Sequence, residues 1–301
     1  MMEGPETGRG RREPADASSL RVALIGAGAV GTAVSVLLAR GGHRISGVAS
    51  RSEASARLAA GRLGARVFDP QEELPDSDVV LIATPDGVIA EVAARLGPRV
   101  GSGSVVCHFA GSLGLGPLRA VLAAGAEACA LHPVQALPDA DSALARLPGS
   151  AWGVTSTEGA RSWAFSVVEN ELQGHPVGVA EEHRPLWHAA AVTTSAGLRA
   201  LLSTAVAALE SIGVEEAPAV LAPLVVGTAA NSLATGVTLT GPFVRGETDT
   251  VVRHLAAYAA YAPDLKADYV RIAGLILDGV ARDAVLPVEA QSSMRAVLES
   301  A

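Results

Sequence analysis

The stretch that decides the fold is Val22-Ala23-Leu24-Ile25-Gly26-Ala27-Gly28-Ala29-Val30-Gly31, near the start of the chain. Its apolar half ends at Gly26, and a helical pattern over residues 29–40 begins inside the motif. A glycine turn between a strand and a helix is typical of domains that bind dinucleotides: Gly26 permits the tight turn, Gly28 lets the backbone approach a pyrophosphate, and Gly31 lets the helix pack on the strand. The free N–H groups of the helix start would face the phosphates. The alternative is a glycine-rich turn without a ligand.

Beyond this motif, short apolar runs alternate with turn signals and helical patterns as far as residue 180. The runs rich in Val, Ile and Ala are predicted to be strands, namely Arg21–Ile25, Arg44–Ala49, Ala65–Phe68, Asp78–Ala83, Ser104–Phe109, Ala126–Leu131, Ala151–Thr155 and Pro176–Val179. Their lack of polar alternation indicates strands buried on both faces, as in a parallel sheet covered by helices. We therefore expect an α/β fold, with a Rossmann-type doubly wound sheet over residues 20–181 that binds a dinucleotide.

The pattern changes after residue 180, where strand-like runs stop. Helices are predicted at His183–Ile212, Val214–Thr235, Thr248–Tyr261, Asp264–Asp283 and Val288–Glu299. The first would be about 45 Å long at about 1.5 Å per residue, which is too long for one small domain to cover. We therefore expect residues 182–301 to form an all-helical domain for dimerisation and substrate binding, and the chain to be a homodimer.

Composition narrows the classes of function. Of 301 residues, 49% are hydrophobic and 18% are charged, which is enough apolar material for a large core. The net charge of −8 disfavours nucleic acid or an anionic membrane as a partner. Residues 1–19 are predicted to be a flexible arm rather than a signal peptide, and we find no apolar run near the ~18 residues of a membrane span. Cys107 and Cys129 make neither a disulfide framework nor a metal site. We expect a cytoplasmic protein that acts on a small molecule.

The residues after the second predicted strand decide between NAD and NADP. NAD enzymes carry an Asp or Glu about 20 residues past the glycine motif, where it binds the ribose 2′-OH. Here the strand is followed by Ser50-Arg51-Ser52, and the first carboxylate, Glu53, comes later in a helix. A 2′-phosphate would find a guanidinium and two hydroxyls, all of them donors, so we expect NADPH/NADP as the cofactor. The alternative is that Arg51 is a solvated surface charge.

Two further segments follow strands at the edge where such sheets bind ligands. Thr84-Pro85-Asp86 either contacts the ribose or nicotinamide of the cofactor or is a plain strand-ending turn. After the predicted strand Ser104–Phe109, Ala110 is a candidate cofactor contact and Ser112 is a candidate catalytic residue. His108 still lies within the apolar strand, so we expect a core histidine with its hydrogen bonds satisfied.

Two histidines are candidate catalytic residues. His132 follows another strand at the same edge, together with Gln135 as a candidate substrate contact. Trp187-His188 opens the first C-terminal helix, where His188 either protonates an alkoxide or an amine as hydride arrives or only packs between domains. Ser195 falls on the same helical face as His188, and it is a candidate substrate contact like Trp187.

The C-terminal half supplies two more candidate substrate contacts, Asn231 and Arg245. Arg245 lies in the Gly/Pro-containing loop Leu239–Glu247, where it could bind a carboxylate, cap a helix or pair with Glu247. Lys266 is the only lysine, and it lies in a late helix. Reductases of β-hydroxy acids and of ketopantoate use a lysine as proton donor, so that chemistry would need Lys266 or a substitute such as His188.

These motifs together resemble a family of Rossmann-like oxidoreductases with a DUF2520 C-terminal domain. The resemblance is carried by Gly26–Gly31, His108–Ser112, Leu131–Pro133, Trp187–Ala191, and Leu239–Glu247 followed by Tyr269. That family is related to pyrroline-5-carboxylate reductase and to the F420-dependent NADP oxidoreductases. It implies an NADP-binding Rossmann domain and a helical domain that dimerises, and it implies a reductase fold more firmly than a substrate.

The chain departs from that family at three positions. Relatives usually carry Tyr where Trp187 stands, Asn where Ala196 stands, and Asp where Glu247 stands. Loss of the Tyr hydroxyl and the Asn amide removes polar contacts near the expected pocket. The substrate is therefore expected to be more apolar than the family norm, or the family's usual chemistry is altered.

The leading hypothesis is an NADPH-dependent reductase that transfers hydride to a C=N or C=O bond of a small metabolite. Imine reduction is favoured, because an iminium is already activated and the single lysine is distant. One alternative is a hydroxy-acid dehydrogenase of the ketopantoate or β-hydroxy acid type. Another is a non-catalytic sensor or scaffold that binds NADPH. No metal is expected.

Overall fold

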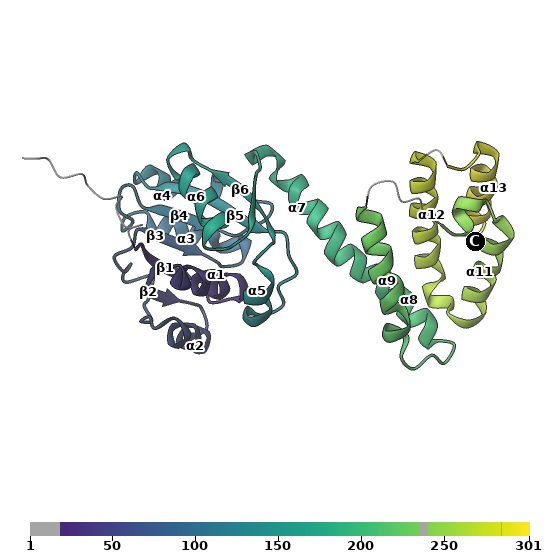
Figure 1. Ribbon diagram of the computed structural model, residues 1–301, viewed down its shortest axis with the longest axis horizontal. Helices are drawn as coiled ribbons and strands as arrows, with labels where there is room; N and C mark the ends of the chain where they lie inside the picture. The colour runs from purple at the N-terminus through teal and green to yellow at the C-terminus, as the bar shows by residue number, and fades with distance from the viewer. Residues whose placement is uncertain (1–18, 235–239, 284) are drawn as a thin grey trace, which may run out of the picture. The chain divides into compact units, whose positions relative to one another are not determined.

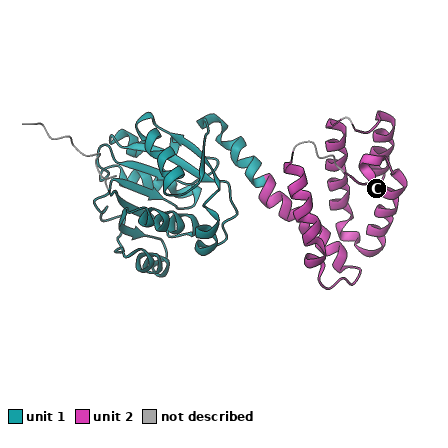
Figure 2. Cartoon of the chain, viewed as in Figure 1, with its two compact units in different colours: residues 1–192 teal, residues 193–301 magenta. Residues whose placement is uncertain are grey.

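The computed structural model of the chain describes residues 19–234, 240–283 and 285–301 (Figure 1). Most of the predicted arm, residues 1–18, lies outside the described residues. The chain divides into two compact units, residues 1–192 and 193–301 (Figure 2). The division falls within a long helix, later than the domain boundary expected at residue 182.

The first unit is built around one sheet with the order β2-β1-β3-β4-β5-β6-β7. The strands are β1 (Arg21–Ile25), β2 (Arg44–Ala49), β3 (Val79–Ile82), β4 (Val105–His108), β5 (Glu127–Pro133), β6 (Ala151–Ser156) and β7 (His175–Gly178). The strands from β2 to β5 in this order pair in parallel, as the apolar runs predict. The expected doubly wound α/β fold is confirmed.

Helices cover both faces of this sheet (Figure 1). They are α1 (Ala29–Arg40), α2 (Glu53–Leu63), α3 (Ile89–Leu96), α4 (Arg119–Ala123), α5 (Ala140–Arg146) and α6 (Glu158–Asn170). Helix α7 (Arg184–Val192) follows the last strand and leads away from the sheet (Figure 1). In β1, Val22 and Leu24 pack with α1, α2, α5 and α6, whereas Ala23 and Ile25 pack with α3 and α4. Because successive strand residues point to opposite faces, both sides of β1 must be apolar.

Two details of the sheet differ from the prediction. The run Ala65–Phe68 is not a strand: it makes a single parallel bridge, between Val67 and Val48 of β2, before the chain turns at Asp69. A run of four apolar residues is too short to be assigned to a strand from sequence alone. In the structure its buried residue is Phe68, which packs against Gly47 of β2. The second difference is that β6 runs antiparallel to β5.

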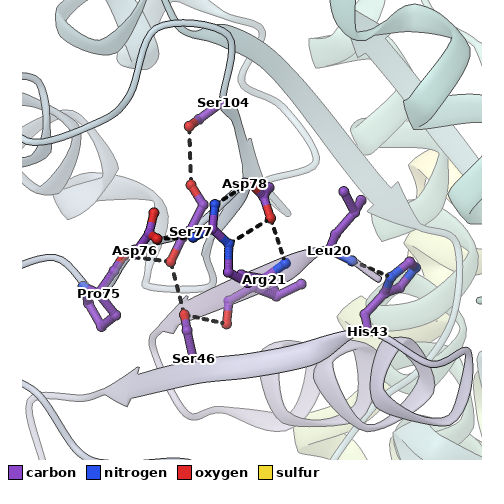
Figure 3. Close-up of polar contacts among 10 residues, drawn as sticks. Leu20, Arg21, His43, Ser46, Pro75, Asp76, Ser77, Asp78 and Ser104 are labelled. Atoms are coloured by element: carbon purple, nitrogen blue, oxygen red, sulfur yellow. Dashed lines mark hydrogen bonds and ion pairs between the residues drawn. The ribbon is translucent and has the colours of Figure 1, made fainter. Parts of the chain in front are cut away.

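A polar network, drawn in Figure 3, joins the amino ends of neighbouring parallel strands. We call this side of the sheet its N-terminal edge, and the side where the strands end its C-terminal edge. At the start of β1, the Arg21 guanidinium bonds both carboxylate oxygens of Asp78, at 2.7 and 3.0 Å, and also contacts Asp76. The Ser46 hydroxyl of β2 donates to the carbonyl of Val22 and lies 2.9 Å from the Ser77 hydroxyl. These bonds connect the starts of neighbouring strands, so this edge is held together by the chain's own side chains.

The second unit contains only helices among its described residues. They are a π-helical turn at Thr193–Gly197, α8 (Leu198–Glu210), α9 (Ala217–Leu233), α10 (Pro242–Arg245), α11 (Thr248–Tyr261), α12 (Lys266–Arg282) and α13 (Val288–Glu299). The buried core of this unit comes from the last four helices, and it includes Phe243, Val251, Leu277 and Met294. The prediction of a helical C-terminal region is confirmed.

One helix, Glu181–Glu210, is long and apolar enough to cross a membrane by length and composition. The expectation of no such run is therefore wrong for this segment. This segment contains no long uninterrupted run of apolar residues, but its average hydropathy is high enough for a span even though it includes charged residues. The helix begins in the first unit, where its Arg184 is fully buried, and none of its apolar window is buried.

Candidate functional site

The glycine turn after β1 has the geometry that its three glycines predict. Gly26 has a φ of +102°, and a Cβ there would lie 2.4 Å from the carbonyl oxygen of Ala83. A Cβ at Gly31 would lie 2.5 Å from the Gly26 carbonyl oxygen and 2.9 Å from Leu24 of β1. Backbone and core atoms cannot move aside, so both positions require glycine.

The start of α1 is open in the way an anion site needs. No atom lies within 4 Å of a Cβ built on Gly28, which is exposed at the first turn of the helix. Helix α1 has no side-chain cap and no acidic residue in its first turn. The N–H groups at the start of a helix have no partner within the helix, so those of Ala29, Val30 and Gly31 can bind phosphate oxygens. The preceding Ala27 is half-buried in the turn.

The segment after β2 also fits its predicted role. Arg51 is exposed, and none of the ion pairs found among the described residues involves it. Glu53 is engaged by Arg57 at 2.5 Å, so it does not take the place of the missing ribose acceptor. The Ser52 hydroxyl oxygen accepts from Ser55 N at 3.3 Å and caps α2, which leaves its proton to donate, and Ser50 is half-buried beside it.

An unsatisfied hydroxyl lies at the end of β3. The Thr84 Oγ atom is buried, and it has no hydrogen-bond partner among the residues that the structure describes. A buried hydroxyl without a partner costs about 1–3 kcal/mol, so a ligand that bonds it is favoured. Pro85 and Asp86 are both exposed, and Asp86 begins a short 3₁₀ turn. The orphaned hydroxyl and the open helix start both fit a dinucleotide at this edge.

His108 at the end of β4 is a core histidine, as expected. Its side chain is fully buried, Ala110 N donates to its Nδ1 at 3.2 Å, and its Nε2 lies 2.9 Å from the carbonyl of Gly114. Burial lowers the pKa of this ring. His108 therefore shapes the loop after β4, and the candidate residues Ala110 and Ser112 belong to that loop.

Three aromatic rings gather at the end of β5. The Trp187 indole Nε1 donates to His132 Nδ1 at 3.1 Å, and the His132 and His188 rings meet edge to face with centroids 5.4 Å apart. Glycines make the room: a Cβ at Gly111 would lie 2.3 Å from the His188 ring, and one at Gly153 would lie 2.6 Å from the Trp187 indole nitrogen. The structure thus brings together three residues that the sequence marks as candidates.

Arg184 holds this cluster in place, and sequence reasoning missed it. Its side chain is fully buried. The guanidinium donates to the carbonyl oxygens of Ala110, Gly111, Ala130 and Gly153 and to the hydroxyl of Thr155. Glu181, just before α7, accepts from the backbone N–H groups of Leu115 and Gly116. The start of α7 is therefore fixed to β4, β5 and β6, and its position in the sequence gives no hint of these partners.

The cluster is electrostatically unusual, since its rings lie beside a buried cation. Burial, the Arg184 charge and His188 together lower the pKa of His132 from 6.5 to about 4. Burial also lowers the pKa of Arg184 itself, to about 10, so this side chain remains charged at neutral pH. His132 is consequently a neutral imidazole at physiological pH.

The remaining candidates have local partners or lie in the other unit. The Gln135 amide donates to Ser150 Oγ at 3.3 Å, and its oxygen accepts from Ala136 N at 2.9 Å. Ser195 and Asn231 belong to the second unit, as does Arg245, whose Nε lies 2.5 Å from a Glu247 carboxylate oxygen. The pairing left open for Arg245 is thus the one observed. Leu239, at the start of its motif, lies outside the described residues.

No metal centre is found among the residues that the structure describes: none of their His, Cys, Asp and Glu side chains gather in threes. Cys107 and Cys129 are buried free thiols, paired in register on β4 and β5. Burial raises the pKa of the Cys129 thiol well above its usual value, so this sulfur is inert at neutral pH.

Two protein families match the chain, each over a different part of it. A Rossmann-like domain matches residues 2–133, and a domain of unknown function, DUF2520, matches residues 150–276. The second match begins before β6, so it includes the strands that extend the sheet beyond β5. A search of curated proteins gives no match.

Solved structures share the fold at low sequence identity. A Bacteroides fragilis protein named as a candidate NADP oxidoreductase is 22% identical with a TM-score of 0.69, covering 83% of this chain and 95% of its own. A pyrroline-5-carboxylate reductase from Coxiella burnetii is 16% identical with a TM-score of 0.57, covering 94% and 98%. A reductive aminase from Aspergillus terreus, in complex with NADPH and ethyl-5-oxohexanoate, is 17% identical with a TM-score of 0.55, covering 94% and 93%.

Proposed function

As a chain that joins a Rossmann-like domain to a DUF2520 domain, this protein is, we propose, an NADPH-dependent reductase of a C=N or C=O bond in a small molecule. The observation that carries the proposal is the open glycine turn at the start of α1. Solved structures of this fold include one named as a pyrroline-5-carboxylate reductase and one as a reductive aminase with NADPH, which supports reduction of a C=N bond.

The first unit supplies each part of the proposed cofactor site. Helix α1 and the Gly28 turn would hold the pyrophosphate, Ser50 and Arg51 the 2′-phosphate, and the buried Thr84 hydroxyl a further polar group. NADPH bound there supplies the hydride. The chain's own contribution is the cluster of His132, Trp187 and His188 at the neighbouring strand end, which would hold the substrate and bring a proton to the product.

The cofactor assignment is tested by Arg51→Ala with Arg57→Ala as its matched control. Both arginines are exposed, and one helical turn of α2 separates them. Loss of a charge-assisted bond to the 2′-phosphate should weaken NADPH binding about 10- to 100-fold. NADH binding should change little, and Arg57→Ala should alter neither. Equal losses for both nucleotides in calorimetry would remove the 2′-phosphate assignment.

The bond type is tested by screening NADPH oxidation. Cyclic imines, 2-oxo acids with an amine, and 2-oxo acids alone should be compared at equal concentration. We expect turnover with the first two groups. Turnover with plain 2-oxo acids alone would favour the hydroxy-acid alternative, although Lys266 is half-buried and donates to the backbone oxygen of Ala301 at 2.6 Å. Tight NADPH binding without any turnover would favour a sensor or scaffold.

We further propose that the second unit forms a homodimer. Helix α9 is apolar almost throughout, yet Ala217 is its only buried residue among those described. Leu224 is 67% exposed and Leu233 is 89% exposed. A patch of this kind usually marks an interface. Leu224→Glu should give monomers in light scattering, while Leu58→Glu on α2 should not, and a monomeric wild-type protein would contradict the proposal.

A further inference from the structure

We infer that Trp187 is a positioning residue that fixes His132 as the Nε2–H tautomer, so that His132 presents a hydrogen-bond donor to the substrate. The inference rests on the proposed reductase for the identity of what is bound, but the tautomer itself is a property of the free protein. It also gives a purpose to a position where relatives carry tyrosine.

The first step is the chemistry of the indole. The Trp187 Nε1–H group can only donate, and it lies 3.1 Å from His132 Nδ1. That nitrogen must then offer its lone pair. A neutral imidazole carries one proton, which must therefore be on Nε2. A tyrosine hydroxyl would leave the tautomer open, because it can either donate or accept.

The second step is that the ring stays neutral. The charged and titratable groups that face it are Arg184 and His188, both on α7. The residues facing the cluster from the β4 loop and from β6 are Gly111 and Gly153, which bring no charge. Protonation of Nδ1 would also place two N–H groups against each other. Within the described part of the chain, no neighbour therefore stabilises an imidazolium.

The third step is the direction of the donor. A Cβ on Gly111 would lie 2.8 Å from His132 Nε2, so this nitrogen lies against the turn after β4, on the side of the ring away from Trp187. The His188 ring packs against the same glycine. An N–H donor there selects a substrate atom with a lone pair: a carbonyl oxygen, a neutral imine nitrogen or a carboxylate oxygen. His132 would polarise that atom and keep its own proton, which leaves His188 or water to protonate the product.

The tautomer is measured directly by long-range ¹H–¹⁵N correlation spectra of labelled protein at pH 7, without nucleotide or substrate. The signals of His132, one of seven histidines, are identified by their loss in His132→Asn. We expect wild-type His132 to carry its proton on Nε2. Trp187→Phe should give a mixture of tautomers, and Trp163→Phe, its matched control on α6, should change nothing. A proton on Nδ1 in the wild type, or an unchanged tautomer in Trp187→Phe, would overturn the inference.

A second pair of variants keeps the test independent of how well Trp187→Phe folds. In His132→Gln the amide nitrogen reaches the place of Nε2, whereas in His132→Asn only the place of Nδ1 is filled. Loss of one well-aligned donor lowers kcat about 100-fold or more, so Asn should fall that far and Gln much less. Equal losses would refute the donor role. An Nε2–H tautomer in a protein without reductase activity would instead refute the proposed function alone.

Discussion

At the N-terminal edge of the sheet, Arg21 forms an ion pair with Asp78, and the two side chains are 40% and 37% exposed. At the C-terminal edge, by contrast, Arg184 is fully buried and has no carboxylate among its hydrogen-bond partners. The side chains drawn at the first edge find their partners within the chain (Figure 3). The second edge keeps the Thr84 hydroxyl unsatisfied and the first turn of α1 uncapped.

The difference sets how large the effect of a substitution should be at each edge of one sheet. Exposed ion pairs are screened by water, and each contributes little to the free energy of unfolding. Substitutions at the N-terminal edge should therefore have small effects. Buried polar groups without a hydrogen-bond partner, and side chains whose pKa is shifted by burial, lower the stability of the fold unless a ligand binds them. The C-terminal edge is therefore the place where substitutions should have large effects, and the three tryptophans, all in the first unit, report its unfolding by fluorescence.

The largest effect should come from Arg184→Met. Removal of the guanidinium leaves the buried carbonyls of Ala110 and Gly111 without their donor and frees the start of α7, so we expect a loss of about 4 kcal/mol in the free energy of unfolding. Urea denaturation followed by tryptophan fluorescence measures it. Arg119→Met removes an exposed arginine on α4 and should be nearly neutral. A similar small effect for both would erase the contrast between the two kinds of arginine.

The next largest effect should separate two neighbouring glycines. Gly26→Ala forces a positive φ on alanine and drives Cβ into the Ala83 carbonyl, which should cost about 3 kcal/mol of stability. Gly28→Ala meets no atom, so its stability should stay within about 1 kcal/mol of wild type, while NADPH binding falls about 10-fold or more. The two readouts are urea denaturation and calorimetry. If Gly28→Ala binds NADPH normally, the pyrophosphate does not lie against α1.

A third effect, of about 2 kcal/mol once screening of the partly exposed ring is allowed for, should follow pH. His132 has a folded pKa of about 4 against about 6.5 when unfolded, so between these values only the unfolded chain takes up a proton. Stability should therefore fall as the pH drops from 6.5 to 4, and the lowered pKa of His108 acts in the same direction. His132→Asn should reduce this slope in urea titrations, and an unchanged slope would contradict the assignment.

The smallest effect belongs to the N-terminal edge. Arg21 lowers the pKa of Asp78 from 3.8 to about 2, so the pair stabilises the fold above pH 3.8 and that contribution is lost as the pH falls toward 2. Asp78→Asn should remove the acid dependence in that window and lower stability at pH 7 by less than the other changes do. Asp141→Asn, at an exposed ion pair elsewhere, serves as the control. A loss at Asp78 as large as that at Arg184 would overturn the comparison of edges.

Local patterns predicted most elements, including β1, β2, α11 and α13 to the residue. They failed at Ala65–Phe68, where four residues cannot reveal whether a run joins a sheet or packs beneath it. They also gave no sign that β6 is antiparallel, because strand direction depends on how the whole connection folds back. For the site, the sequence marked His132, Trp187 and His188 separately.

The sequence by itself determined the sheet, the glycine turn and the helical second half, because these follow from apolar periodicity and from backbone conformations that only glycine adopts easily. Only the tertiary structure decided that Trp187 donates to His132, 55 positions away, and that Arg184 reaches carbonyls up to 74 positions away. Such contacts form where distant strand ends meet at one edge of a sheet, and no local pattern encodes which side chains meet there.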